Sequence, residues 1–150
     1  PSDNAATALD LCQQARRTLR IFSRSLDPAV YAREDIVSAL SALARRHRQS
    51  EIRLLICDES PLREQRHPLI ELCQRLPSSI PLRVLPFDSQ AELNEFFVLA
   101  DRSGIFVHSE SAPETSWCSY FLPPKVSDYQ ERFDRMWARG EQLRYLRRLY

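Results

Sequence analysis

Glycine is nearly absent from the sequence, because Gly104 and Gly140 are the only two among 150 residues. The Rossmann fingerprint, the P-loop and the nucleophile elbow of hydrolases all need glycine for tight turns or for close backbone approach to a ligand. The shortage therefore excludes binding of dinucleotides or nucleoside triphosphates through these motifs.

Closely spaced cysteines and histidines are also missing. The four cysteines are widely separated: Cys12, Cys57, Cys73 and Cys118. The three histidines are equally scattered: His47, His67 and His108. No CxxC or HExxH spacing occurs, so no metal site, redox dithiol or catalytic triad is marked. We expect reduced core thiols in a cytoplasmic protein, without a metal or cofactor.

Long apolar segments and a strong charge imbalance are absent as well. No run approaches the roughly 20 apolar residues that cross a bilayer, and the start, PSDNAATALD, lacks the basic and apolar regions of a signal peptide. The sequence has 21 basic and 20 acidic residues, which gives a net charge of +1. Lys125 is the only lysine, and the other basic residues counted are arginines. This balance gives no general attraction to membranes or nucleic acid. Because the chain begins without Met, we expect residues 1–150 to be a single domain excised from a larger protein.

The first half of the chain alternates helical and strand patterns. Helical periodicity of apolar residues appears around residues 5–15, 36–43 and 68–76. Apolar strand patterns lie between and after them, at residues 18–23, 52–57 and 81–86. This alternation predicts an α/β fold with a mixed, mostly parallel sheet flanked by helices.

The second half has a different pattern. Strands are predicted at residues 96–100 and 105–108, joined by a DRSG turn in which Gly104 would take a positive φ. A further strand at 117–122 is expected to stop at Pro123 and Pro124. Ser127 and Gln130 resemble a capping box for the next helix. Its core-facing aromatic stripe is Tyr129, Phe133 and Trp137, and a last helix is expected to carry Leu143, Leu146 and Leu149.

Polar residues follow the predicted parallel strands. Ser23, Ser25, Asp27 and Asp58 lie just beyond strand ends, where open α/β sheets bind ligands. The alternative interpretation is that these residues end strands and cap helices.

The order of these elements over residues 5–140 resembles one half of the phospholipase D-like fold. Members of that family use an H-x-K-x4-D motif on the first strand of the pair, where His attacks phosphorus and Lys binds phosphate oxygens. Registering this motif on Asp101 places Asn94 at the His position and Phe96 at the Lys position. Asn cannot act as the nucleophile and Phe cannot neutralise phosphate charge, so the resemblance implies a degenerate half-domain without catalytic residues.

Several segments also resemble an uncharacterised proteobacterial domain often found C-terminal to GNAT-type acetyltransferases. They are SRSLDP, LLICD, FVLADRSGIF and FDRMWARGEQLRYLRRL. The resemblance implies a bacterial accessory domain that packs on an upstream domain of the same chain or associates with itself.

The leading hypothesis is therefore a non-catalytic binding or regulatory module for a small anionic ligand. Its candidate ligand-binding residues are Ser23, Arg24, Asp27, Asp58, Asn94 and Asp101. One alternative is a phosphodiesterase or nuclease in which His108 is a displaced catalytic histidine. A second, less favoured alternative is nucleic-acid binding through the arginines near the C-terminus, Arg139, Arg144, Arg147 and Arg148.

Overall fold

The chain forms one mixed β-sheet covered by helices on both faces. The computed structural model describes residues 2–86, 88, 95–110 and 112–144. The strands are β1 (Thr18–Ser23), β2 (Glu51–Ile56), β3 (Leu82–Val84), β4 (Glu95–Ala100), β5 (Gly104–Ser109) and β6 (Trp117–Ser119). The helices are α1 (Ser2–Gln14), α2 (Pro28–Tyr31), α3 (Glu34–Arg46), α4 (Ser60–Glu64), α5 (Pro68–Arg75) and α6 (Pro123–Arg139), with a 3₁₀ turn at Pro113–Thr115.

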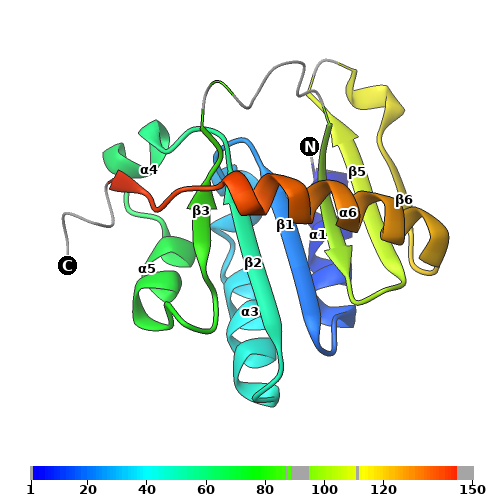
Figure 1. Ribbon diagram of the computed structural model, residues 1–150, viewed down its shortest axis with the longest axis horizontal. Coiled ribbons are helices and arrows are strands. Elements are labelled where there is room, and N and C mark those ends of the chain that lie inside the picture. The colour runs from blue at the N-terminus through cyan, green and yellow to red at the C-terminus, as the bar shows by residue number, and fades with distance from the viewer. Residues whose placement is uncertain (1, 87, 89–94, 111, 145–150) are drawn as a thin grey trace.

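The strand order across the sheet is β3-β2-β1-β4-β5-β6. β1, β2 and β3 pair in parallel, whereas β4, β5 and β6 pair with their neighbours in antiparallel fashion. As a result β1, β2, β3 and β5 run in one direction, and their carboxyl ends lie at one edge of the sheet (Figure 1). The predicted α/β class and its mixed sheet flanked by helices are confirmed.

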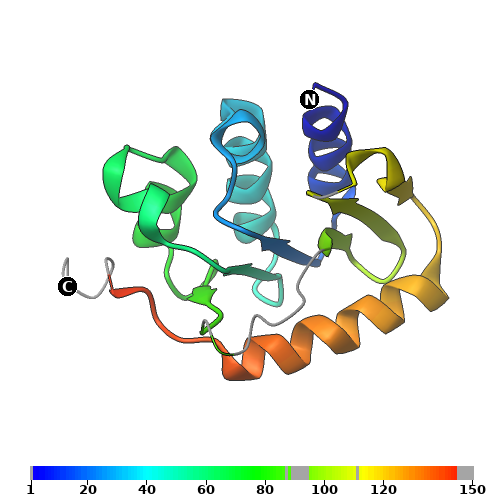
Figure 2. The ribbon, with the colours of Figure 1, turned by 90° about the horizontal axis from the view of Figure 1, so that it is seen from above.

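Helices cover both faces of the sheet (Figure 2), and an apolar core lies on each face. Leu11, Leu40 and Leu72, from α1, α3 and α5, belong to the core on one face. Phe133 and Trp137 of α6 belong to the core on the other face, so the predicted aromatic stripe is buried. No helix in the described part of the chain is both long and apolar enough to cross a membrane.

The start of α6 differs from the prediction. Pro123 and Pro124 were expected to end a strand, but they begin the helix instead. Proline is tolerated there because the first N–H groups of a helix have no intrahelical acceptor and its φ is already helical. Ser127 is therefore inside α6 and is not its cap. The expected last helix falls largely outside the described residues, although Leu143 is buried as predicted.

The turn between β4 and β5 also corrects an expectation. Asp101, not Gly104, has the positive φ, at 55°, and neither glycine takes one. Gly104 is required for space: an added Cβ would lie 2.8 Å from Leu11 Cδ2 and 3.0 Å from Gln14 Nε2. Glycine at this position lets α1 pack closely on β5.

Burial of the thiols follows the expectation at three of four positions. Cys12, Cys57 and Cys73 are buried, and burial raises the pKa of the Cys57 thiol to about 11 and that of Cys73 to about 12. Cys118 is exposed, contrary to the expectation, because it lies on the edge strand β6.

Candidate functional site

Three of the predicted ligand-binding residues line one pocket. It has a volume of about 290 Å³ and opens at the carboxyl ends of β1 and β5. We call it the β1–β5 pocket, and its lining includes Ser23, Arg24, Ser25, Asp27, Tyr31, Phe106, His108, Ser109 and Glu110. The strand ends bring these residues together because β5 runs in the same direction as β1.

The loop after β1 is held by side-chain hydrogen bonds. The Leu26 N–H donates to Ser23 Oγ at 3.0 Å, and the Ala29 N–H donates to Asp27 Oδ1 at 3.0 Å. Both side chains therefore cap local backbone, as the structural alternative proposed, while also lining the pocket. Leu26 itself is fully buried with a φ of 59°. A branched residue in that conformation is strained by about 1–3 kcal/mol and persists only where its surroundings enforce it.

His67 also fixes the loop after β1. Its Nε2–H donates to the Leu26 carbonyl at 2.9 Å, and its Nδ1 accepts the Leu69 N–H at 3.2 Å. This pair of partners assigns the neutral tautomer, and burial lowers the pKa of the imidazole. The sequence predicted that a helix begins at Pro68 but not that His67 caps it.

Arg24 is the cation at the mouth of the pocket. Its Nε donates to Glu110 Oε1 at 2.6 Å, and this hydrogen bond raises the pKa of the guanidinium. The guanidinium carbon lies 5.2 Å from the centre of the Phe96 ring, within range of a cation–π contact. About half of each charged side chain is exposed, at 46% for Arg24 and 47% for Glu110, so this ion pair contributes little to stability.

His108 is half-buried beside these charges. Its ring stacks on Phe106 at 5.4 Å and lies 6.0 Å from Phe96. Burial is the main influence and lowers the pKa of the imidazole. The negative charges of Glu110 and Asp27 raise this pKa by a smaller amount. At neutral pH the ring is therefore uncharged.

Asp58 lies in an adjacent hollow rather than in the β1–β5 pocket. Its Oδ1 accepts the Ser60 N–H at 2.9 Å at the start of α4. Arg24 borders both hollows, and its carbonyl accepts the backbone N–H groups of Cys57 and Asp58. Asp58 is thus a neighbour of the pocket through Arg24.

Asp101 is at the opposite end of the sheet, so the structure separates it from the other candidates. Its Oδ1 accepts the N–H groups of Arg17 and Thr18 at 2.9 and 3.0 Å, and its Oδ2 accepts that of Arg16 at 3.0 Å. This carboxylate is a structural acceptor. Asn94 lies outside the described residues.

Sequence reasoning missed Glu110, Tyr31 and Phe106 as pocket residues. Nothing in their spacing marks them: Phe106 and Glu110 reach the pocket through the pairing of β5 with β4, and Tyr31 lies on α2, which follows β1. Within the described residues, no three His, Cys, Asp or Glu side chains cluster closely enough to hold a metal ion.

Comparisons with known proteins agree with this geometry. The model of a family described as "Domain of unknown function (DUF7931)" matches residues 1–149. No curated protein matches the sequence. Among solved structures, NucT from Helicobacter pylori is similar with a TM-score of 0.63 and 11% identity, covering 95% of this chain and 92% of that one. NucT has a phospholipase D-like fold, and the likeness confirms that fold for this chain.

Proposed function

We propose that this chain, which belongs to the DUF7931 family, is a non-catalytic phospholipase D-like module that binds a small anionic ligand in the β1–β5 pocket. The observation that carries the proposal is the placement of Arg24 at the mouth of that pocket. A guanidinium has five N–H donors in a planar fork, and the contact with Glu110 occupies Nε, so further donors are offered to a carboxylate or phosphate.

The rest of the lining favours a ligand that also carries hydroxyl or amino groups. Asp27 and Glu110 are hydrogen-bond acceptors, and the neutral His108 imidazole can donate or accept. These acidic groups would repel a ligand that is purely anionic. The chemistry of the pocket therefore fits a small molecule with one anionic group and several donors.

The strained loop supports binding by a preformed site. Leu26 is held at positive φ by hydrogen bonds to Ser23 and His67 on either side of its peptide. Strained backbone of this kind is concentrated at ligand sites, where it fixes lining residues before the ligand arrives.

Several features argue against the usual chemistry of the fold. Phe96 is fully buried where the resemblance expects a phosphate-binding Lys. The only lysine, Lys125, lies in the first turn of α6 on the other side of the sheet from α1 and α3. His67 has both ring nitrogens engaged, and His47 follows α3 at the opposite end of the sheet. One imidazole, that of His108, is left at the pocket.

The alternative function is a phosphodiesterase or nuclease that uses His108. The observation in its favour is that His108 lines the same pocket with its pKa lowered by burial, so the ring is neutral and could act as a nucleophile. The likeness to NucT is compatible with a nuclease. Among the described lining residues, Arg24 is the one arginine or lysine that could hold the phosphate in this alternative, and Glu110 partly neutralises its charge.

Binding is tested by titrating the protein with glycerol 3-phosphate, which carries one phosphate group and two hydroxyl donors, and following backbone amide signals by NMR. We expect shifts at residues 23–27 and 108–110 that disappear in Arg24→Ala. Arg33→Ala is the matched control, because Arg33 is also an exposed, ion-paired arginine but lies outside the pocket. Shifts that persist in Arg24→Ala, or shifts that are absent at those residues in the wild type, would remove the site.

The resemblance to a domain found behind acetyltransferases extends the proposal to a regulatory role. In that case the module would pack on a neighbouring domain of the same gene product and report ligand binding to it. Proteolysis of the full-length gene product with and without the ligand tests this role, and equal cleavage rates in both conditions would count against it.

A further inference from the structure

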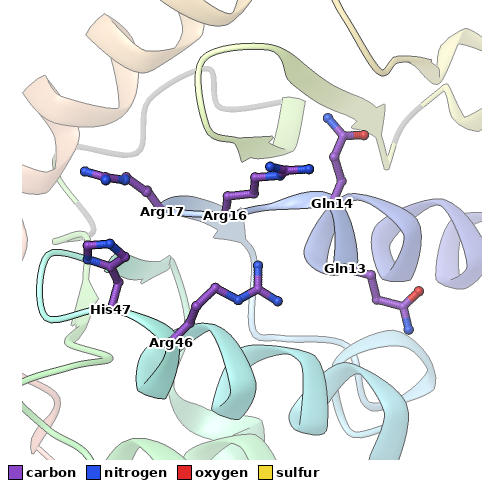
Figure 3. A pocket seen from close by; sticks show the side chains of 6 residues that line it. All are labelled: Gln13, Gln14, Arg16, Arg17, Arg46 and His47. Carbon is purple, nitrogen blue, oxygen red and sulfur yellow. The ribbon is translucent and has the colours of Figure 1, made fainter.

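A second pocket, formed mainly by basic residues, lies at the other end of the sheet. It has a volume of about 600 Å³. We call it the basic pocket, and it is lined by Gln13, Gln14, Arg16, Arg17, Arg46 and His47. Figure 3 shows two separate segments meeting here: the end of α1 with the turn that follows it, and the end of α3, from which Arg46 and His47 point toward that turn.

The turn that carries two of these arginines is firmly held. The N–H groups of Arg16 and Arg17 donate to the Asp101 carboxylate, and the Arg17 carbonyl accepts the Glu51 N–H at 2.7 Å. The Arg17 side chain also reaches the turn between α3 and β2, where its Nη1 donates to Gln49 Oε1 at 3.3 Å. The backbone is therefore fixed in the orientation that presents both guanidinium groups.

More positive charge gathers here than the helix ends require. The carboxyl ends of α1 and α3 carry about half a negative charge each. Five exposed arginines lie at or directly after these ends: Arg16, Arg17, Arg45, Arg46 and Arg48. Asp101 and Glu51 supply two negative charges close by. An excess of about two positive charges therefore remains after the helix ends are also offset.

The ion pairs of the molecule do not reduce this excess. Among the described residues, none of the salt bridges involves an arginine of the basic pocket. The amides of Gln13 and Gln14, which also line the pocket, can donate hydrogen bonds to oxygen. No acidic side chain lines the pocket. The chemistry is that of a site for phosphate groups.

We propose that the basic pocket binds the phosphate backbone of double-helical nucleic acid without regard to base sequence. Arginine forks suit phosphate oxygens, and contacts to the backbone carry no sequence information. No aromatic side chain lines the pocket, and stacking on aromatic rings is what favours single strands. The pocket is broad and is built from two segments, which fits successive phosphates of a duplex better than one small ion.

This surface is distinct from those considered above. It does not include the arginines near the C-terminus, and it lies at the opposite end of the sheet from the β1–β5 pocket (Figure 1). The inference is independent of the proposed function, so either can fail alone.

The test measures fluorescence polarisation of a labelled DNA duplex of roughly two helical turns while salt is raised from about 50 to 200 mM. The variants are the double substitution Arg16→Ala with Arg46→Ala and a matched control, Arg33→Ala with Arg66→Ala. The control removes the same charge from exposed arginines outside the basic pocket. Circular dichroism establishes that each variant is folded.

We expect wild-type affinity to fall steeply with salt, because phosphate contacts release counterions. The pocket variant should lose affinity at every salt concentration and reduce the slope of log affinity against log salt by about two, while the control binds as the wild type. Equal losses in pocket and control variants, affinity independent of salt, or no binding at low salt would overturn the proposal. Binding that depends on the pocket but occurs only with vesicles of anionic phospholipid would also overturn it.

Discussion

The carboxylate of Asp101 accepts the backbone N–H of Arg17 at 2.9 Å, joining the turn after β4 to the turn before β1 across 84 positions of sequence. The same carboxylate accepts the N–H groups of Arg16 and Thr18, and the Asp101 N–H donates to the Thr18 carbonyl at 2.8 Å. Asp101, the residue on which the H-x-K-x4-D motif was registered in the sequence, therefore stabilises the fold at the end of the sheet away from the pocket.

Replacing Asp101 should destabilise the protein without affecting ligand binding in the β1–β5 pocket. Asp101→Ala removes the acceptor of three N–H donors and also places alanine at a positive φ. We therefore expect the free energy of unfolding to fall by about 3 kcal/mol. Asp101→Asn keeps one acceptor oxygen and tolerates that φ, so the loss should be about 1 kcal/mol. Urea denaturation measures both.

The control is Asp128→Asn on the exposed side of α6, which should change stability by less than about 0.5 kcal/mol. If Asp101→Ala were as mild as this control, the structural role assigned to Asp101 would be wrong.

Placing a lysine at position 96, as the resemblance expects, should destabilise the fold. Phe96 is fully buried against Phe22, with ring centres 5.0 Å apart. Phe96→Lys would bury an ammonium group there, and we expect the free energy of unfolding to fall by more than about 3 kcal/mol. Phe96→Leu conserves most of the volume and should cost about 1 kcal/mol. Chemical denaturation that finds equal stability for the two variants would contradict the burial of Phe96.

Stability should fall as the solution becomes acidic, in part through His67. Burial lowers the pKa of His67 in the folded protein, whereas an unfolded imidazole titrates near pH 6.5. The unfolded chain therefore takes up a proton first, so the contribution of His67 is fully present above about pH 6.5 and is lost as pH falls toward the folded pKa. Denaturation at a series of pH values should show the free energy of unfolding decreasing below neutrality.

The variant His67→Asn tests the source of that dependence. Asn can still accept the Leu69 N–H as a helix cap, but it has no proton to gain. We expect the stability of this variant to depend less steeply on pH than that of the wild type. His108 accounts for part of the slope that remains in the variant, because burial also lowers the pKa of His108. An unchanged slope in His67→Asn would show that His67 does not titrate as proposed.

The strands and the two core layers were predictable from sequence because apolar periodicity reports burial directly. β1 was placed at its observed bounds, and the stripe of Phe133 and Trp137 faces the core as expected. Pro123 misled the prediction because proline both stops strands and starts helices, and only the neighbouring structure decides between these roles.

The candidate site was predictable only in part. Ser23, Arg24 and Asp27 could be placed because parallel strands end at a common edge. Glu110 could not be placed, because its position beside Arg24 depends on how β5 pairs in the sheet, and no local sequence pattern predicts that pairing. The positive φ was assigned to Gly104 because glycine adopts it most easily. Asp101 takes it because the carboxylate gains three donors from a distant segment.

The central claim, that the β1–β5 pocket binds rather than cleaves, is tested most directly by phosphodiester turnover of the purified, folded protein. The substrates are bis(p-nitrophenyl) phosphate and labelled single- and double-stranded DNA, each assayed with the wild type and with His108→Ala. We expect the wild type to release no product above the His108→Ala background. Turnover by the wild type that His108→Ala abolishes, with its fold intact, would contradict it.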